Sequence, residues 1–288
     1  MEAILETKKL SHIYSAGTPF ERGALLEVDF TAYAGEYLGI IGHTGSGKST
    51  LIQHLNGLLK PTSGQVLFQG EDIWADAKRT RQTRFQVGLV FQYPEYQLFE
   101  ETVYKDISFG PKNMGLDEGE VDRRVREAAR FVGLRDDQLE KSPFELSGGQ
   151  KRRVAIAGVI AMEPRVLILD EPTAGLDPQG VSDLLELLAS LRDGLGMTIL
   201  MATHDMDVVP LCCDYAYLLG GGSVLARGTP EELFAQAELL RANHLRLPRI
   251  AHLMAILRDR DGLDVAPVGT IGAARRELLR LLKQEELL

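Results

Sequence analysis

The pattern of apolar and polar residues predicts two kinds of β-sheet. Apolar and polar residues alternate along residues 5–14 and 24–33, as they do in antiparallel strands with one covered face. Residues 37–41, 166–169 and 198–202 are apolar almost throughout, which is typical of parallel strands buried on both faces. The chain is therefore expected to have an α/β fold that combines an antiparallel sheet with a buried parallel one.

Helical patterns separate these strands and continue to the end of the chain. Residues 101–133 are helical in pattern, with residues 118–132 strongly charged on one face, and they are expected to belong to a helical subdomain inserted at about residues 93–164. From residue 230 onward the pattern is helical, and a leucine-rich amphipathic segment closes it at 273–288. We therefore predict one α/β domain over residues 1–229 and a C-terminal helical extension over residues 230–288. The other helices before the extension are predicted at residues 51–59, 151–162 and 179–194.

A glycine-rich segment lies between the strand at 37–41 and the helix at 51–59. Residues 42–50 fit the phosphate-binding loop pattern in its required context of strand, loop and helix. The glycines let the backbone curl, so that its N–H groups and the helix start point at one anion. Lys48 is then placed to reach the β- and γ-phosphates, and the Ser49 hydroxyl to ligate Mg²⁺. We expect nucleotide binding here rather than a chance glycine-rich turn, through Gly42, His43, Thr44, Gly45, Ser46, Gly47, Lys48, Ser49 and Thr50.

A second predicted helix start, like the one after the phosphate-binding loop, is suited to binding an anion. The sequence Leu-Ser-Gly-Gly-Gln at residues 146–150 precedes the helix predicted at 151–162. Ser147 and the two glycines after it place free N–H groups at that helix start, which favours an anion. The plainer alternative is an ordinary serine N-cap. Two phosphate-binding helix ends in one chain suggest that each serves a different nucleotide.

Two carboxylates follow one of the buried strands. Asp170 and Glu171 stand at the C-terminal tip of the strand at 166–169, the edge where ligands bind in open α/β sheets. Asp170 is positioned to hold Mg²⁺ directly or through water. Glu171 is one residue further and could polarise an attacking water as a general base. The alternative is a surface acidic pair, which a phosphate-binding loop in the same chain makes less attractive.

Three other side chains at strand ends are candidates that are weaker when taken alone. Tyr14 ends the first strand and could stack on a base, although core packing is the simpler interpretation. Gln92 follows the strand at 87–91 and could ligate the metal or hold a water, although a glutamine in a loop is usually solvated. His204 follows the strand at 198–202 and could contact a γ-phosphate.

Charge and composition limit the possible partners and location. The 288 residues have a formal net charge of -9, which disfavours nucleic acid as a partner because that affinity comes mainly from neutralising phosphates. The longest apolar run, at 154–162, is shorter than the about 20 residues that span a bilayer. The first residues carry no signal-peptide pattern, so we expect a cytoplasmic protein. The adjacent Cys212 and Cys213 build no disulfide framework.

Taken in order, these motifs resemble those of the ATPase subunit of an ABC transporter. The resemblance covers about residues 5–228 and implies an ABC-type nucleotide-binding domain of the P-loop NTPase fold. It implies that Tyr14 stacks on adenine and that residues 42–50 are the Walker A loop. It also implies that Ser49, Gln92 and Asp170 hold Mg²⁺, with ATP and Mg²⁺ as the cofactors.

The same resemblance implies how hydrolysis is divided between two chains. Glu171 matches the catalytic base and His204 the switch histidine, with Gln92 as the glutamine of the Q-loop. The signature residues Ser147, Gly148, Gly149 and Gln150, together with Asp177 of the D-loop, are implied to contact ATP that is bound to the other ATPase chain.

Finer features resemble the ATPases of energy-coupling factor transporters. These features are the sequences at residues 91–99, 109–113 and 173–177 and the helical extension. The Tyr-Pro-Glu-Tyr motif at 93–96 resembles the second of two paralogous ATPases. The resemblance implies a peripheral protein on the cytoplasmic face of the membrane, energising uptake of vitamins or of cobalt or nickel ions. The implied partners are a second ATPase in a heterodimer, or another copy in a homodimer, and a membrane scaffold whose coupling helices bind at about 93–110. A substrate-binding membrane subunit would be reached only indirectly. The alternative is a soluble ABC ATPase, for example in iron–sulfur assembly.

Overall fold

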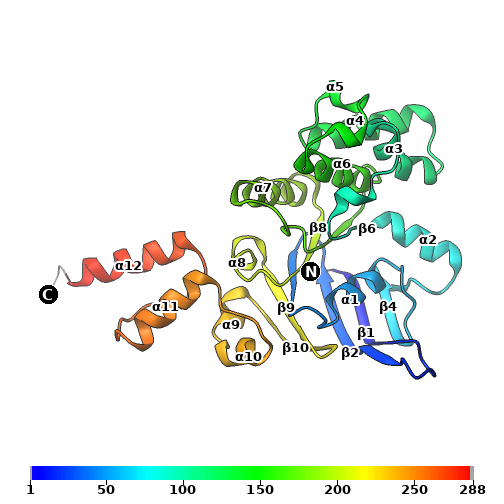
Figure 1. The fold of residues 1–288 in the computed structure, drawn as a ribbon. Helices are drawn as coiled ribbons and strands as arrows, with labels where there is room; N and C mark the ends of the chain where they lie inside the picture. Colours follow the sequence, from blue (N-terminus) through cyan, green and yellow to red (C-terminus); the bar gives the residue numbers. More distant parts are fainter. Residues whose placement is uncertain (1, 286–288) are drawn as a thin grey trace.

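The computed structural model describes residues 2–285, and it contains two sheets (Figure 1). The antiparallel sheet has the strand order β2-β1-β4-β5, and the second sheet has the order β10-β9-β3-β8-β7-β6. Both predicted kinds of sheet are therefore present. The first sheet comprises β1 Ala3–Tyr14, β2 Arg22–Tyr33, β4 Ser63–Phe68 and β5 Glu71–Asp72. The second comprises β3 Tyr37–Ile41, β6 Val87–Val90, β7 Val166–Asp170, β8 Thr198–Thr203, β9 Tyr215–Gly220 and β10 Ser223–Gly228.

The second sheet is parallel from β6 to β9, and only β10 runs antiparallel to its neighbour β9. Strands β3, β7 and β8 are buried along their whole length because both faces of the sheet are covered. Leu167 and Leu169 of β7 pack into the hydrophobic cluster shared with the helical subdomain. Val166 and Ile168 of the same strand pack into the cluster shared with α1 and the antiparallel sheet. The parallel pairing of β3 with β8 and of β8 with β7 brings the C-terminal tips of these strands to one edge of the sheet.

Twelve α-helices are found within residues 2–285, and one group of them forms the helical subdomain at the top of Figure 1. In that group α3 and α4 both contact α6. The helices are α1 Lys48–Leu55, α2 Ala77–Gln86, α3 Val103–Asn113, α4 Glu118–Phe131, α5 Asp136–Leu139, α6 Gly148–Ile160, α7 Pro178–Leu195, α8 Val209–Cys212, α9 Pro230–Phe234, α10 Ala237–Ala242, α11 Arg249–Asp259 and α12 Ile271–Glu285. Short 3₁₀ turns lie at Pro94–Gln97 and Pro143–Glu145.

The helical pattern predicted over 101–133 consists of the two helices α3 and α4. Gly115 adopts a left-handed backbone with φ of 81°, which ends the first helix. The Asp117 carboxylate then accepts a hydrogen bond from the Glu120 amide at 3.0 Å and caps the second helix. The pattern of charged residues along 101–133 does not reveal where one helix ends and the next begins, because both helices present their charged faces to solvent.

The C-terminal extension has two parts in the structure. Helices α9 and α10 contribute Leu233, Phe234 and Leu240 to the large hydrophobic cluster that also contains Leu167 and Leu169 of β7. Helices α11 and α12 share a smaller cluster centred on Met254 and Ala274, and Figure 1 shows them projecting away from the sheets. The division at residue 230 stays a prediction, and residues 286–288 of the last predicted helix lie outside the described part of the chain.

Candidate functional site

The phosphate-binding loop joins β3 to α1, and its glycines are required by close packing. A Cβ at Gly42 would clash with the Ser46 hydroxyl and the Leu219 carbonyl oxygen. Gly47 has φ of 108°, and a Cβ there would lie 2.8 Å from the Ala24 carbonyl oxygen. The backbone can curl in this way only without side chains at these two positions.

Lys48 points its ammonium back into the loop. Its Nζ donates hydrogen bonds to the carbonyl oxygens of Gly42 at 2.7 Å and His43 at 3.2 Å, and it lies 3.6 Å from Glu171 Oε1. Burial lowers the pKa of the Lys48 ammonium, and the carboxylates of Glu171 and Asp170 oppose that shift. A cation is therefore held where the loop amides converge, which suits an anionic phosphate group.

Asp170 ends β7 and is 7% exposed. Burial raises the pKa of its carboxyl, and a hydrogen bond from the Ser49 hydroxyl opposes the shift. Its Oδ1 atom is buried and has no hydrogen-bond partner among the described residues. An unpartnered carboxylate oxygen beside a hydroxyl, with the Gln92 side chain lining the same cleft, is a donor set that fits Mg²⁺.

Glu171 stands one residue beyond the strand, in a strained left-handed backbone with φ of 47°. Its amide donates to the Ala202 carbonyl oxygen at 2.8 Å, and Thr203 Oγ1 donates to its Oε2 at 3.2 Å. The Nδ1 atom of His204 lies 2.8 Å from Oε1. Neighbouring strand β8 therefore fixes the direction of this carboxylate and pairs it with the histidine.

A cleft of about 350 Å³ lies here, and its lining includes Ser49 and Glu171 but not Asp170, whose carboxyl accepts a hydrogen bond from Ser49. Tyr14 is 39% exposed there, so the alternative of a tyrosine packed in the core is wrong. Its ring meets His12 edge-on with centroids 4.5 Å apart, and its hydroxyl lies 3.3 Å from Thr50 Oγ1. The predicted residues that line the cleft are Tyr14, Thr44, Gly45, Gly47, Lys48, Ser49, Thr50, Gln92, Glu171 and His204.

Three predicted loop residues do not line the cleft themselves. Gly42 and Ser46 are buried beneath it, and the Ser46 hydroxyl has no partner within residues 2–285. His43 points elsewhere, because its Nδ1 lies 2.7 Å from the Thr44 carbonyl oxygen and its ring is 5.8 Å from that of His244. These three residues shape the loop, while the others face the cleft.

Arg22 is a cleft residue that the sequence analysis missed. It lines the cleft with its neighbours Gly23 and Ala24, and it pairs with Tyr14 across strands β1 and β2. Its side chain makes no hydrogen bond or ion pair with the rest of the described chain. Only the hairpin register places it opposite Tyr14, and the alternation of apolar and polar residues does not specify that register.

The signature residues and Asp177 lie outside the cleft of their own chain. Ser147 and Gln150 form a capping box at the start of α6, and Ser147, Gly149 and Gln150 line a separate hollow of about 400 Å³. Asp177 caps α7 by accepting a hydrogen bond from the Gly180 amide at 2.7 Å. The structure thus separates the predicted site into the nucleotide cleft and an exposed helix start that lines a different hollow.

Known proteins with this arrangement are ABC-type ATPases. The ABC transporter family matches residues 25–174 of this chain. The energy-coupling factor transporter ATP-binding protein EcfA2 of Clostridium acetobutylicum is 50% identical over 281 residues, covering 97% of this chain and 98% of the relative. Among solved structures, cbiO1 of Clostridium perfringens, described as part of the ABC transporter complex cbiONQ, is 48% identical with a TM-score of 0.75. It covers 89% of this chain and 100% of its own.

A third match is the ATP-binding cassette MJ0796, solved as a dimer in a post-hydrolysis state bound to ADP and Pi. It is 26% identical with a TM-score of 0.69 and covers 79% of this chain and 99% of its own.

The fold and the cleft define an ATPase of the ABC type, which binds and hydrolyses ATP. More narrowly, this chain belongs to the family of energy-coupling factor transporter ATP-binding proteins and corresponds to the second of the two paralogues. Its hydrolysis is accordingly coupled to transport. The alternative of a soluble ATPase for iron–sulfur assembly is not supported, since relatives matched over nearly the whole chain are transporter subunits.

Proposed function

We propose that this chain is one of two unlike ATPase subunits that drive an energy-coupling factor transporter for vitamins or for cobalt or nickel ions. The observation that carries the proposal is the separation of the signature residues at Ser147–Gln150 from the cleft. Each chain then holds a nucleotide-binding half and a signature half, and a complete site needs two chains facing head to tail. The dimeric form of a relative with ADP and Pi supports this arrangement.

The residues of the cleft divide the work of hydrolysis. Lys48 and the loop amides bind and orient the phosphates, and Tyr14 stacks on the base. Glu171 accepts the proton of the attacking water, and His204 holds the Glu171 carboxylate in place through the 2.8 Å contact. Ser49, Gln92 and Asp170 would hold Mg²⁺, which when bound neutralises charge on the phosphate oxygens.

A cluster of exposed aromatic residues marks the proposed contact with the membrane scaffold. Tyr93, Tyr96, Phe99 and Phe109 are 43%, 84%, 59% and 49% exposed. The rings of Phe99 and Phe109 meet edge-on at 5.1 Å, and Tyr93 and Tyr96 lie 6.2 Å apart. Apolar groups gathered on a surface suit an amphipathic coupling helix, which supports a partner at residues 93–110. This contact would hold the chain at the cytoplasmic face of the membrane. None of the helices within residues 2–285 is long and apolar enough to cross a bilayer.

Arg22→Ala is expected to raise the KM for ATP by about 5-fold with little change in kcat. An exposed cation beside the loop should contribute roughly 1 kcal/mol through a charge-assisted contact to nucleotide. ATP titrations of turnover measure the effect, with Arg22→Lys as the variant that keeps the charge and Lys48→Ala as a positive control with a much larger loss. An unchanged KM would show that Arg22 does not contact nucleotide.

The proposed assembly is tested by affinity purification of this chain from detergent-solubilised native membranes. We expect a second ATPase and an integral scaffold protein to copurify, and small membrane subunits with them would identify the transported substrates. Recovery of a scaffold protein together with only copies of this chain would show that the ATPase is a homodimer and not a heterodimer. Soluble partners alone would contradict the proposed membrane assembly.

A further inference from the structure

A larger cavity lies at the opposite edge of the parallel sheet from the nucleotide cleft. It has a volume of about 850 Å³ and adjoins Arg165 and Thr198, where β7 and β8 begin, whereas the cleft lies where these strands end. One wall comes from α4 and α6 of the helical subdomain, and the other from the sheets and the end of α7. Its apolar lining includes Ile4, Ala128, Phe131, Ile160, Leu195 and Met197.

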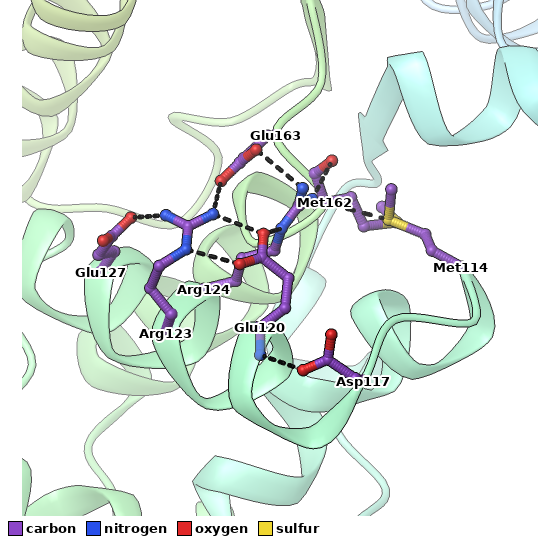
Figure 2. A network of polar contacts seen from close by, with 8 residues as sticks. All are labelled: Met114, Asp117, Glu120, Arg123, Arg124, Glu127, Met162 and Glu163. Carbon is purple, nitrogen blue, oxygen red and sulfur yellow. Dashed lines mark hydrogen bonds and ion pairs between the residues drawn. The ribbon is translucent and has the colours of Figure 1, made fainter.

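The acidic side chains of this cavity are already paired. Glu127 lies 2.6 Å from Arg123, and Glu163 lies 3.0 Å from both Arg123 and Arg124. Figure 2 shows these arginines bridging α4 to Glu163, which follows α6, with Glu120 completing the network. The carboxylates that line the cavity are therefore neutralised by a network that also fixes its rim.

Two basic side chains of the cavity have no such partners. Arg130 of α4 and Arg165, just before β7, line the cavity. Neither side chain makes a hydrogen bond or an ion pair anywhere in residues 2–285. The lining thus combines an apolar surface with two unmatched guanidinium groups, which prefer carboxylates and related planar or tetrahedral anions.

We propose that this cavity binds a small amphipathic anion, an organic carboxylate with an apolar body. The apolar body fills the space between α4, α6 and the sheet, and the carboxylate pairs with Arg130 and Arg165. The volume falls within the roughly 300–1,000 Å³ of small-molecule sites, which are mainly apolar with a few placed polar groups. The occupant touches both the helical subdomain and the core, and it meets α6 at the end opposite Ser147. This binding does not depend on the proposed transport assembly.

The test uses the full chain with saturating MgADP and the fluorescent probe 1-anilinonaphthalene-8-sulfonate, an aromatic body with one anionic group. We expect one saturable site per chain, which sodium decanoate displaces. Arg130→Gln combined with Arg165→Gln should lower the affinity for the probe at least 10-fold. The control is Arg260→Gln combined with Arg275→Gln, which removes the same charge from exposed positions of the extension and should leave binding unchanged.

A second variant tests the cavity without changing charge. Leu195 is 54% exposed at the rim, so Leu195→Trp can enter the cavity without disturbing the buried core, and it should also weaken the probe. Retained MgADP binding shows that each variant is folded. Equal probe affinity in the double arginine variant and the wild type would overturn the proposal, as would probe binding that sodium decanoate does not displace.

Discussion

ATP turnover at this chain's own cleft is expected to fall by about 10²- to 10⁴-fold when Glu171 is replaced by glutamine, the range for removing a general base. The amide keeps the size of the side chain but cannot accept the proton of water. Nucleotide affinity should stay close to that of the wild type, because Lys48 remains bonded to the Gly42 and His43 carbonyl oxygens. The variant should therefore hold ATP without hydrolysing it.

Phosphate release is best measured in the assembled transporter after the corresponding carboxylate of the partner ATPase has been neutralised, so that only this chain's site contributes. Glu186→Gln is the matched control, because Glu186 is exposed on α7 and its side chain makes no hydrogen bond or ion pair within the described structure. Turnover in Glu171→Gln equal to that in the control would show that another group takes the proton.

The part of the site that lies within single motifs could be predicted from the sequence. Residues 42–50 carry their own context of strand, loop and helix, and Asp170 and Glu171 end an apolar strand whose tip must face the ligand edge. Tyr14, Gln92 and His204 were weak candidates alone because each also has an ordinary structural interpretation. The parallel register of β3, β7 and β8 brings Glu171 and His204 to the loop, and adjacent strand ends make that outcome predictable.

Features that depend on register or packing between distant segments were not predictable. Arg22 belongs to the cleft because it pairs with Tyr14 in a hairpin with several irregular register shifts, which alternation alone does not specify. The hollow beside Arg130 and Arg165 arises where α4, α6 and the sheet meet. Side-chain volumes in three dimensions decide such a cavity, and periodicity along the chain carries no information on it.

Ser147→Arg is expected to lower the hydrolysis of ATP bound to the partner chain by about 100-fold or more. Hydrolysis in this chain's own cleft should be unaffected. Ser147 is exposed at the start of α6 and lines a hollow separate from the cleft, so under the proposed function it contacts ATP across the dimer. A bulky cation there blocks closure onto the phosphates. Losing the hydrogen bond from the Gln150 amide to the Ser147 hydroxyl lowers the free energy of unfolding by only about 1 kcal/mol, so the chain should still fold and bind nucleotide.

Two backgrounds separate the two sites. In the assembled transporter with Glu171→Gln only the partner's nucleotide is hydrolysed, and adding Ser147→Arg should abolish that activity. With the partner's carboxylate neutralised instead, only this chain's nucleotide is hydrolysed, and Ser147→Arg should have little effect. Ser182→Arg, at an exposed serine of α7, is the control for an added surface charge. The reverse pattern, with this chain's own site lost and the partner's kept, would mean that the signature acts within its own chain, which the separation of the two hollows argues against.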